Sequence, residues 1–333
     1  MKYYSNILKL IGRTPLVRIN KSNPNPNVLL LAKLEKSNPA GSVKDRIAIS
    51  MVEAAEKEGI LTPDKIVIEP SSGNTGIGLA LICSVKGYPL EIVMPETMSI
   101  ERRKIMTAYG AKITLTPGKT GMNGAEDYVK AIVEKNPDKY FYPDQFGNEN
   151  NPLAHYRYTA EEIINDTDGE IDVLVAGLGT SGTLMGVSRR LKEYNPKIRI
   201  IGVEPVPKSG IQGLKNLETS YVPTIFDASR LDEKIYVTLE DAAHTSRMLT
   251  LSEGIFSGIS SGAAMHVAIE TAKKMDSGTL VVILPDGGEK YISHPIYAPD
   301  KCLECTKICE IKNLWTDEYI QSIAEWWEPN NKL

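Results

Sequence analysis

The chain has 333 residues, long enough for two domains with sizeable cores, and its formal net charge is only −4. Such a charge leaves no basic surface for a nucleic-acid partner. The first residues, Met1 to Asn6, lack the apolar segment of a secretory signal, and no stretch is apolar for long enough to span a bilayer. We therefore expect a cytoplasmic protein that binds neither nucleic acid nor membrane.

Short β-rich runs alternate with helical runs along the chain. The expected strands are 28–34, 66–68, 92–94, 112–116, 173–176, 198–204, 234–237 and 280–284. The expected helices are one from 44 to about 59, one ending at 86, 100–109, 121–136, 152–165, one ending at 194, and two that begin near 240 and 260. This alternation is typical of parallel sheets that helices cover on both faces.

Two such sheets fit the length of the chain, so we predict an α/β fold with two domains, each a twisted, mostly parallel sheet flanked by helices. Proline, asparagine and glycine concentrate near Ser37 and Asn148, where the chain is expected to cross between the domains. The smaller domain is predicted at 38–148, and the larger one at 1–37 together with 149–333.

Lys44 stands at the opening turn of a predicted helix, after Pro39, Gly41 and Ser42. Backbone N–H groups at a helix start already present positive charge, which disfavours an ammonium there and favours a neutral amine or a bound anion. An exposed lysine in a first turn is the plain alternative. The polar turns that follow in the sequence favour a chemical role for Lys44 over this alternative.

The first of three polar strand-to-helix turns is Glu69-Pro70-Ser71-Ser72-Gly73-Asn74-Thr75-Gly76. Ligands of parallel sheets bind at the carboxyl ends of the strands, where this turn is expected. Its hydroxyls, amide and backbone N–H groups converge on one point, which suits a carboxylate or another small anion. A simple capped turn would explain one serine and one glycine, and not the whole run.

The second turn, Gly177-Leu178-Gly179-Thr180-Ser181-Gly182-Thr183, follows the strand that ends at Ala176. It matches the Gly-x-Gly-x-x-Gly pattern of dinucleotide sites, and Glu204 ends the next strand at a suitable distance for a ribose hydroxyl. However, its three hydroxyls suit the greater charge of a terminal phosphate monoester. We therefore favour a monophosphate cofactor, with a dinucleotide as the alternative.

The third turn, Ser257-Gly258-Ile259-Ser260-Ser261-Gly262-Ala263-Ala264, opens another predicted helix. Small residues let a flat ring approach the backbone, and a serine hydroxyl can bond a ring nitrogen without carrying charge. A helix cap with close packing explains the same residues equally well. A lysine, a phosphate cradle and a neutral hydroxyl together meet the needs of pyridoxal phosphate held as an imine.

At these residues the chain resembles the cysteine synthase and cystathionine β-synthase family of fold type II pyridoxal-phosphate enzymes, which share the tryptophan synthase β-subunit fold. In pattern it is most similar to cysteine synthases of the O-acetylserine sulfhydrylase type. The resemblance runs from about Ile7 to Tyr291. Besides the Lys44 segment and the Asn74 and Gly179 turns, the matching motifs are Gly12-Arg13-Thr14-Pro15-Leu16-Val17, Pro95-Glu96-Thr97-Met98-Ser99-Ile100-Glu101-Arg102-Arg103 and Leu284-Pro285-Asp286-Gly287-Gly288-Glu289.

The resemblance implies a role for each matching residue. Lys44 would form the imine and move the substrate's α-proton, Asn74 would bond the phenolic oxygen of the cofactor, and Ser260 would face its ring nitrogen. The phosphate loop would be Gly179, Thr180, Ser181, Gly182 and Thr183. The residues implied for the substrate carboxylate are Ser71, Ser72, Thr75 and Gln145.

The reaction implied is β-replacement or β-elimination on a serine-derived amino acid through an aminoacrylate, in a homodimer. The leading expectation is synthesis of cysteine from an activated serine and sulfide. The alternative direction consumes cysteine, releases hydrogen sulfide and gives serine, lanthionine or pyruvate. A nicotinamide-dependent oxidoreductase built on the Gly177 turn, or a non-catalytic binder that kept the fold, are the candidates from other classes.

The stretch that lines the mouth of the site departs most from the family pattern. The family's Gly-Ile-Gly at the mouth of the site becomes Gly213-Leu214-Lys215, and extra residues follow. We hypothesise that Asp232 reaches this mouth and orients or deprotonates the incoming nucleophile, whereas a solvated loop carboxylate is the plainer reading.

Three of the four cysteines, Cys302, Cys305 and Cys309, cluster beyond the matching region. Their spacing is compatible with a metal site, but a structural zinc site needs four ligands. We therefore expect no metal there, and thiols that are reduced or redox sensitive in the cytoplasm.

Overall fold

The computed structural model describes residues 1, 3–207, 209–292 and 294–297. The chain divides into two compact units, Met1–Lys290 and Tyr291–Leu333, and the fold described below is that of the first unit. Of the second unit only residues next to the division are described, among them the short 3-10 helix Pro295–Tyr297. Cys302, Cys305 and Cys309 lie outside the described residues.

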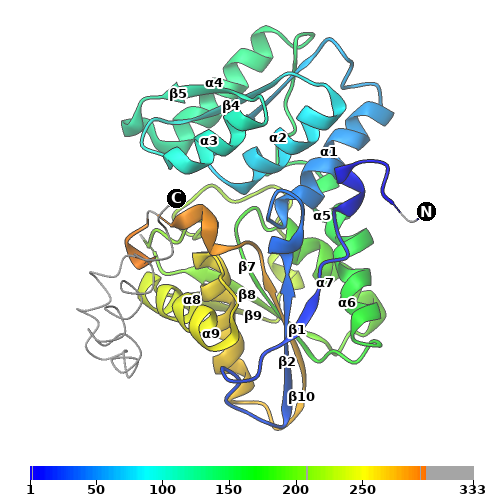
Figure 1. Ribbon diagram of the computed structural model, residues 1–333, viewed down its shortest axis with the longest axis vertical. Coiled ribbons are helices and arrows are strands. Elements are labelled where there is room, and N and C mark those ends of the chain that lie inside the picture. Colours follow the sequence, from blue (N-terminus) through cyan, green and yellow to red (C-terminus); the bar gives the residue numbers. More distant parts are fainter. Residues whose placement is uncertain (2, 208, 293, 298–333) are drawn as a thin grey trace, which may run out of the picture. The chain divides into compact units, whose positions relative to one another are not determined.

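The larger sheet of the first unit has six strands in the order β1-β2-β10-β7-β8-β9 (Figure 1). Their bounds are β1 Leu16–Arg18, β2 Val28–Leu34, β7 Val173–Gly177, β8 Arg199–Pro205, β9 Glu233–Val237 and β10 Gly278–Leu284. The pairs are parallel except that β1 runs antiparallel to β2. The central strands β7, β8 and β10 are buried almost throughout, as strands covered on both faces must be.

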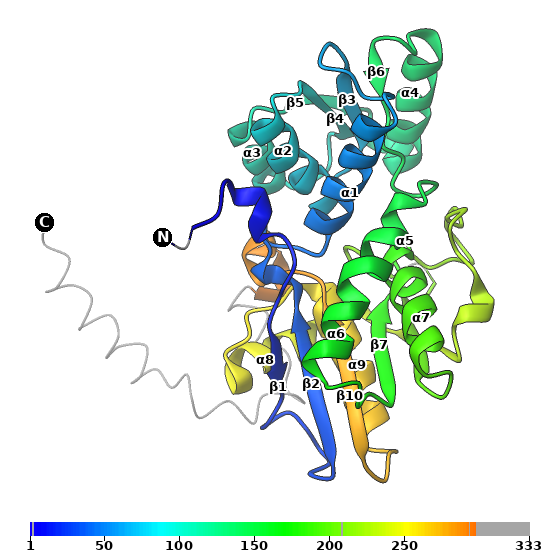
Figure 2. The same ribbon diagram turned by 90° about the vertical axis from the view of Figure 1, so that its right-hand side faces the viewer.

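Helices cover this sheet on two sides, with α9 on one side and α7 on the other (Figures 1 and 2). The bounds are α5 Asn150–Ala154, α6 Ala160–Asp166, α7 Gly182–Tyr194, α8 Leu239–Glu253 and α9 Ile259–Ala272. Between α5 and α6 the backbone forms a π-helical turn, His155–Thr159. The expected helix 152–165 is therefore three joined pieces, and such π-turns often accompany functional sites.

The smaller sheet has four parallel strands in the order β5-β4-β3-β6. Its elements are β3 Ile66–Pro70, β4 Leu90–Pro95, β5 Lys112–Thr116 and β6 Tyr140–Phe141, with helices α1 Lys44–Lys57, α2 Asn74–Lys86, α3 Ile100–Ala108 and α4 Gly121–Lys135. These elements lie inside 38–148. The assignment of this segment as a separate domain stays a prediction, because residues 1–290 pack as one compact unit.

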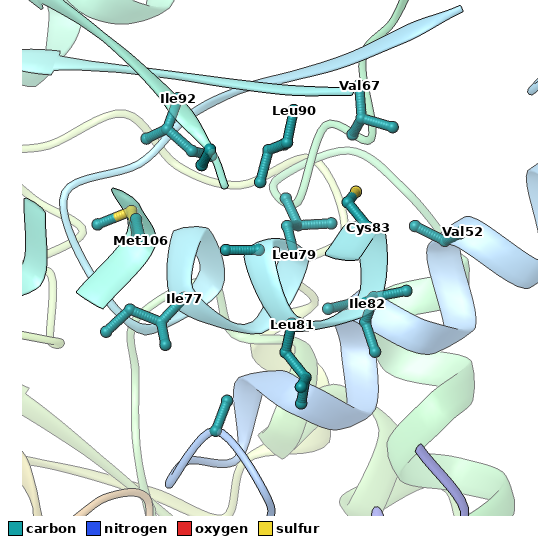
Figure 3. Close-up of a cluster of buried hydrophobic side chains, with 14 of the residues drawn as sticks. Val52, Val67, Ile77, Leu79, Leu81, Ile82, Cys83, Leu90, Ile92 and Met106 are labelled. Carbon is teal, nitrogen blue, oxygen red and sulfur yellow. The ribbon is translucent and has the colours of Figure 1, made fainter. Parts of the chain in front are cut away.

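Helix α2 is the buried centre of this part of the fold (Figure 3). Ile77, Leu79, Ile82 and Cys83 are almost fully buried, and they pack in one cluster with residues of the sheet and with Val52 of α1. A helix that is apolar around most of its circumference is stable only when neighbours cover it on all sides. The burial of α2 therefore fixes where its first turn, with Asn74, lies.

Gly78 shows how closely α2 approaches α1. A Cβ atom at this position would lie 3.2 Å from the main-chain oxygen of Lys44. Glycine therefore lets the first turns of α1 and α2 lie side by side, and the two predicted site residues Lys44 and Asn74 are brought to one place by packing that the local sequence does not show.

The structure confirms the predicted α/β fold class and places every expected strand and helix within a few residues of its predicted position. The short strands β1 and β6 were not expected, because three and two residues carry too little pattern to predict. Among the described residues, no helix has the length and apolar character needed to cross a membrane.

Candidate active site

A cavity of about 380 Å³ lies where the carboxyl ends of strands from both sheets meet. Its walls include the ends of β3, β7 and β10, as expected for the ligand site of parallel sheets. The predicted site residues that line the cavity are Lys44, Ser71, Ser72, Asn74, Thr75, Gln145, Gly179, Thr180, Ser181, Thr183 and Ser260. Gly182, the first residue of α7, stands in the chain between the lining residues Ser181 and Thr183.

Lys44 is the first residue of α1, and its ammonium nitrogen lies 3.3 Å from Thr180 Oγ1. Burial lowers the pKa of Lys44 to about 8, while the nearby Asp286 carboxylate acts in the opposite direction. At pH 7 roughly a tenth of such a lysine is the neutral amine, against a vanishing fraction for an exposed lysine. The geometry therefore supplies a nucleophilic amine at neutral pH.

The glycine-rich turn between β7 and α7 is shaped by two close contacts. A Cβ on Gly179 would lie 2.4 Å from the main-chain oxygen of Gly213, and a Cβ on Gly182 would lie 1.8 Å from Asn151 Oδ1. Ser181 has a left-handed backbone, with φ of +67°. Because the turn runs into the start of α7, it offers backbone N–H groups and hydroxyls to a single anion.

One hydroxyl of this turn is held from behind by a histidine that the sequence did not reveal. Thr183 Oγ1 lies 3.2 Å from His155 Nε2, and His155 Nδ1 lies 2.9 Å from Thr159 Oγ1. Burial, together with the cations of Arg46 and Lys44, lowers the pKa of His155 well below its usual value. The imidazole is therefore neutral, and its place on the π-helical turn could be found only from the structure.

The turn between β3 and α2 is also polar but differently held. Ser71 Oγ accepts a hydrogen bond from the Gly76 N–H at 3.0 Å, and the Thr75 hydroxyl donates to Gln145 Oε1 at 2.5 Å. The N-cap residue of α2 is Gly73, which has no side chain to bond the helix start. Of the first N–H groups of α2, that of Gly76 is bonded to Ser71, and those of Asn74 and Thr75 suit a carboxylate.

Glu69 supports the segment that carries Gln145. Its buried carboxyl accepts hydrogen bonds from the backbone N–H groups of Asp144 at 3.1 Å and Gln145 at 3.5 Å. Burial and the Asp144 carboxylate raise the pKa of Glu69 to about 8. The segment that carries Gln145 is thus attached to the strand β3 by a contact of Glu69 that the sequence of its turn did not indicate.

Asn74 lies between two charged residues from the end of the unit. Its Nδ2 donates to Asp286 Oδ2 at 2.7 Å, and Lys290 Nζ donates to Asn74 Oδ1 at 3.0 Å. Ser260, which is 3% exposed, lies in the first turn of α9 and lines the same cavity. The hydroxyl of Ser260 is an uncharged partner for any ring that enters the cavity.

The mouth of the cavity, defined here as Arg102, Phe146, Gln212 and Lys215, departs most from the expected pattern. The Lys215 ammonium lies 3.7 Å from the centre of the Phe146 ring, and burial lowers the pKa of Lys215. Arg102 donates to Gln212 Oε1 at 2.6 Å. The sequence marked 213–215 as altered, but the partners of Lys215 became known only from the structure.

Asp232 does not reach the mouth, and the hypothesis that it acts there is wrong. Its carboxylate binds Lys192 Nζ at 2.8 Å and accepts from the Ile200 N–H at 2.7 Å. Asp232 precedes β9, and Ile200 lies near the start of β8. In a parallel sheet the starts of the strands lie at the edge opposite to their carboxyl ends, so this carboxylate is across the sheet from the cavity.

These features fit pyridoxal phosphate. The glycine turn leaves room that a Cβ atom would fill, the Lys44 amine suits an aldehyde, and the Ser260 hydroxyl suits a ring nitrogen. Within the described part of the chain, no group of three or more His, Cys, Asp or Glu side chains is arranged to hold a metal ion.

Comparison with known proteins supports the same chemistry. Residues 7–286 match the family model described as "Pyridoxal-phosphate dependent enzyme". The cysteine synthase of Aquifex aeolicus is 48% identical over 305 residues, which cover 89% of this chain and 93% of that protein. The matched segment 7–286 contains the whole cavity lining.

Two solved structures are similar in fold and sequence. The O-acetyl serine sulfhydrylase isoform 3 from Entamoeba histolytica aligns with a TM-score of 0.84 and 41% identity, covering 89% of this chain and 92% of that chain. A hydrogen sulfide-producing enzyme from Fusobacterium nucleatum aligns with a TM-score of 0.83 and 43% identity, covering 87% of this chain and 100% of that chain.

Proposed function

Because this chain belongs to the family of pyridoxal-phosphate-dependent enzymes and is 48% identical to a cysteine synthase, we propose that it is a cysteine synthase. It would exchange the β-substituent of an activated serine, such as O-acetylserine, for sulfide. The observation that carries this proposal is the meeting in one cavity of the Lys44 amine, the anion-binding turn 179–183 and the anion-binding turn 71–75.

The residues that would hold the cofactor are Lys44 at its aldehyde, Gly179 to Thr183 at its phosphate, Asn74 at its phenolic oxygen and Ser260 at its ring nitrogen. When bound, pyridoxal phosphate supplies the electron sink that makes the α-proton of an amino acid removable and its β-substituent a leaving group. A serine hydroxyl does not donate a full proton to the ring nitrogen as a carboxylic acid would, and this favours expulsion of the β-substituent.

Lys44 is proposed to move the proton at the substrate's α-carbon. A general base works best when its pKa lies near the working pH, and a pKa of about 8 meets this condition. The Asp286 carboxylate stabilises the ammonium that forms when Lys44 takes the proton. Burial therefore favours the neutral amine of Lys44, whereas the Asp286 carboxylate favours its ammonium.

The turn 71–75 is proposed to bind the carboxylate of the amino acid. The backbone N–H groups at the start of α2 and the Ser72 hydroxyl would bind this carboxylate, and Gln145 is held beside them by the hydroxyl of Thr75. Binding at two anion sites, one for the cofactor and one for the substrate, orients the α-carbon with respect to Lys44.

Borohydride reduction of the holoenzyme, followed by peptide mapping, tests the attachment. We expect a reduced cofactor adduct on Lys44, and cysteine formation from O-acetylserine and sulfide. Lys44→Ala should lower cysteine formation by about 10²–10⁴-fold, as for the loss of a general base. An adduct on another lysine, or an active Lys44→Ala enzyme, would reject the assignment.

A second candidate function is the cysteine-consuming direction. It is supported by the 43% identity to the hydrogen sulfide-producing enzyme of Fusobacterium nucleatum. Incubation with cysteine as the only amino acid, with assays for sulfide, serine, lanthionine and pyruvate, separates the two. This candidate is preferred if kcat/KM for sulfide release exceeds kcat/KM for cysteine formation.

The proposal includes a homodimer that works in the cytoplasm, as the family resemblance of the sequence implies. Light scattering coupled to size-exclusion chromatography of the holoenzyme measures the mass directly. A mass of one chain at working concentrations would reject the dimer, and fractionation of the cells that express the protein tests its location.

A further inference from the structure

The amide of Asn74 has an orientation that its neighbours determine. Lys290 Nζ donates to Asn74 Oδ1 at 3.0 Å, and Asn74 Nδ2 donates to Asp286 Oδ2 at 2.7 Å. An ammonium can only donate and an ionised carboxylate can only accept, so a reversed amide would face both neighbours with the wrong group. Asn74 therefore has a single allowed orientation.

The Lys290 ammonium is fully used in this arrangement. Its three bonds go to Asn74 Oδ1, to the main-chain oxygen of Ala40 at 2.9 Å and to that of Gly41 at 3.0 Å. An ammonium has three donors, so each has a partner. Lys290 is 5% exposed and does not line the cavity.

These three bonds connect the two residues proposed to meet the cofactor. Ala40 and Gly41 belong to the loop just before Lys44, and Gly41 adopts φ of +77°, which favours glycine. Asn74 begins α2. One ammonium thus joins the approach to α1 with the start of α2.

We propose that Lys290 is a positioning residue, which holds the Asn74 amide so that its NH₂ group, and never its oxygen, is presented to the cavity. This inference rests on the proposed function, because the group met by that NH₂ is the phenolic oxygen of pyridoxal phosphate. One N–H of Asn74 is bound to Asp286, and the second remains for the cofactor. Two facing oxygen acceptors would repel each other, so the orientation decides whether Asn74 helps or hinders binding.

The test compares Lys290→Met, which keeps the stem and removes the donors, with Lys290→Arg, which keeps a cation that only donates. The matched control is Lys36→Met. It removes a half-buried lysine that donates to the main-chain oxygen of Phe256 and that has no bond to Asn74. Cofactor affinity and the ratio of the two absorption bands of the bound cofactor, one in the near ultraviolet and one in the visible, are measured for each holoenzyme.

For Lys290→Met we expect about a tenfold weaker cofactor affinity, as for the loss of one buried hydrogen bond, and a changed ratio of the bands. Lys290→Arg and Lys36→Met should stay within twofold of the unchanged protein. In the cofactor-free protein, the side-chain NH₂ signal of Asn74 in a ¹⁵N spectrum should shift in Lys290→Met and stay in place in Lys36→Met. Unchanged affinity, bands and NH₂ signal in Lys290→Met would overturn the inference.

A double-mutant cycle excludes a purely structural role. If Lys290 acts through the amide, Lys290→Met should change the cofactor affinity less than twofold in an Asn74→Ala background. The same tenfold loss in both backgrounds would overturn the inference. Lys290→Gln replaces Lys290→Met in every measurement if the methionine variant does not fold. If the unchanged protein binds no cofactor, the proposed function fails, whereas normal binding with an unaffected variant rejects only the role of Lys290.

Discussion

Two turns of the molecule are proposed to bind anions, and the structure holds them in different ways. The turn 179–183 is shaped by glycines in close contact with Gly213 and Asn151, which leave no room for a Cβ atom. The turn 71–75 is held by hydroxyls that bond to neighbours, including the contact between Thr75 and Gln145. The turn 179–183 suits a cofactor that stays bound, and the turn 71–75 suits a substrate that enters and leaves in each cycle.

The largest effect is expected from a substitution that disrupts the turn 179–183 by steric contact. Gly182→Ala would place a methyl group 1.8 Å from Asn151 Oδ1, and Asn151 is itself held by the main-chain oxygen of Gln145. We expect cofactor affinity to fall by about 100-fold or more, because the turn must shift as a whole. Fluorescence or absorbance titration of the cofactor-free protein with pyridoxal phosphate measures it.

Gly73→Ala in the turn 71–75 is the matched control. The nearest atom to the new methyl group would be Arg102 Nη1 at 3.9 Å, and the backbone of Gly73 is extended. Cofactor affinity should stay within about threefold. Equal losses in the two variants would show that the turns do not differ in the way described.

A pair of hydroxyl removals should separate the two turns. Thr75→Val removes the donor to Gln145, so KM for the amino acid should rise about tenfold while cofactor affinity stays within twofold. Thr183→Val removes the hydroxyl that His155 holds, so cofactor affinity should fall about tenfold with a smaller change in KM. Steady-state kinetics and cofactor titration check both, and the comparison fails if both variants change the same quantity.

The pH dependence of cofactor capture follows from the lowered pKa of Lys44. The amine must be neutral to react with an aldehyde, and its pKa in the folded protein is about 8. Capture by the cofactor-free protein should therefore speed up about tenfold from pH 7 to pH 9, since the neutral fraction rises through the pKa. Stopped-flow absorbance measures the rate, and a rise that begins only above pH 10 would show an unperturbed lysine.

The same lowered pKa has a consequence for stability. Folding disfavours the ammonium of Lys44, so the cofactor-free protein should gain stability as the pH rises from about 8 towards 10.5. Lys44→Met should remove this pH-dependent gain. Urea unfolding of both proteins at pH 7 and pH 10 compares the slopes.

The smallest effect is expected far from both turns. Asp232→Asn removes a half-exposed ion pair with Lys192 at the opposite edge of the sheet. Activity with every nucleophile should stay within twofold, and the free energy of unfolding should change by less than about 1 kcal/mol. A selective loss with one nucleophile, measured by steady-state kinetics, would contradict the conclusion that Asp232 has no role at the mouth.

The sequence alone determined the order of the longer strands and helices, the three polar turns and the family. These are local properties, because alternation of apolar residues marks an element and glycine with hydroxyl residues marks an anion-binding turn. The motifs also predicted most of the residues that line the cavity, including Lys44, Asn74 and Ser260. A turn between a strand and a helix of a parallel sheet has only one edge at which to lie.

Only the tertiary structure decided which distant residues support these turns. Lys290 meets Asn74 across 216 positions of sequence, His155 meets Thr183 from a π-helical turn, and Glu69 holds the backbone of Gln145. The tertiary structure also places Asp232 away from the site. Strand direction, and not proximity in the chain, sets the edge of the sheet at which a residue lies. Such partners are selected by the packing of whole helices and sheets, and no local pattern records them.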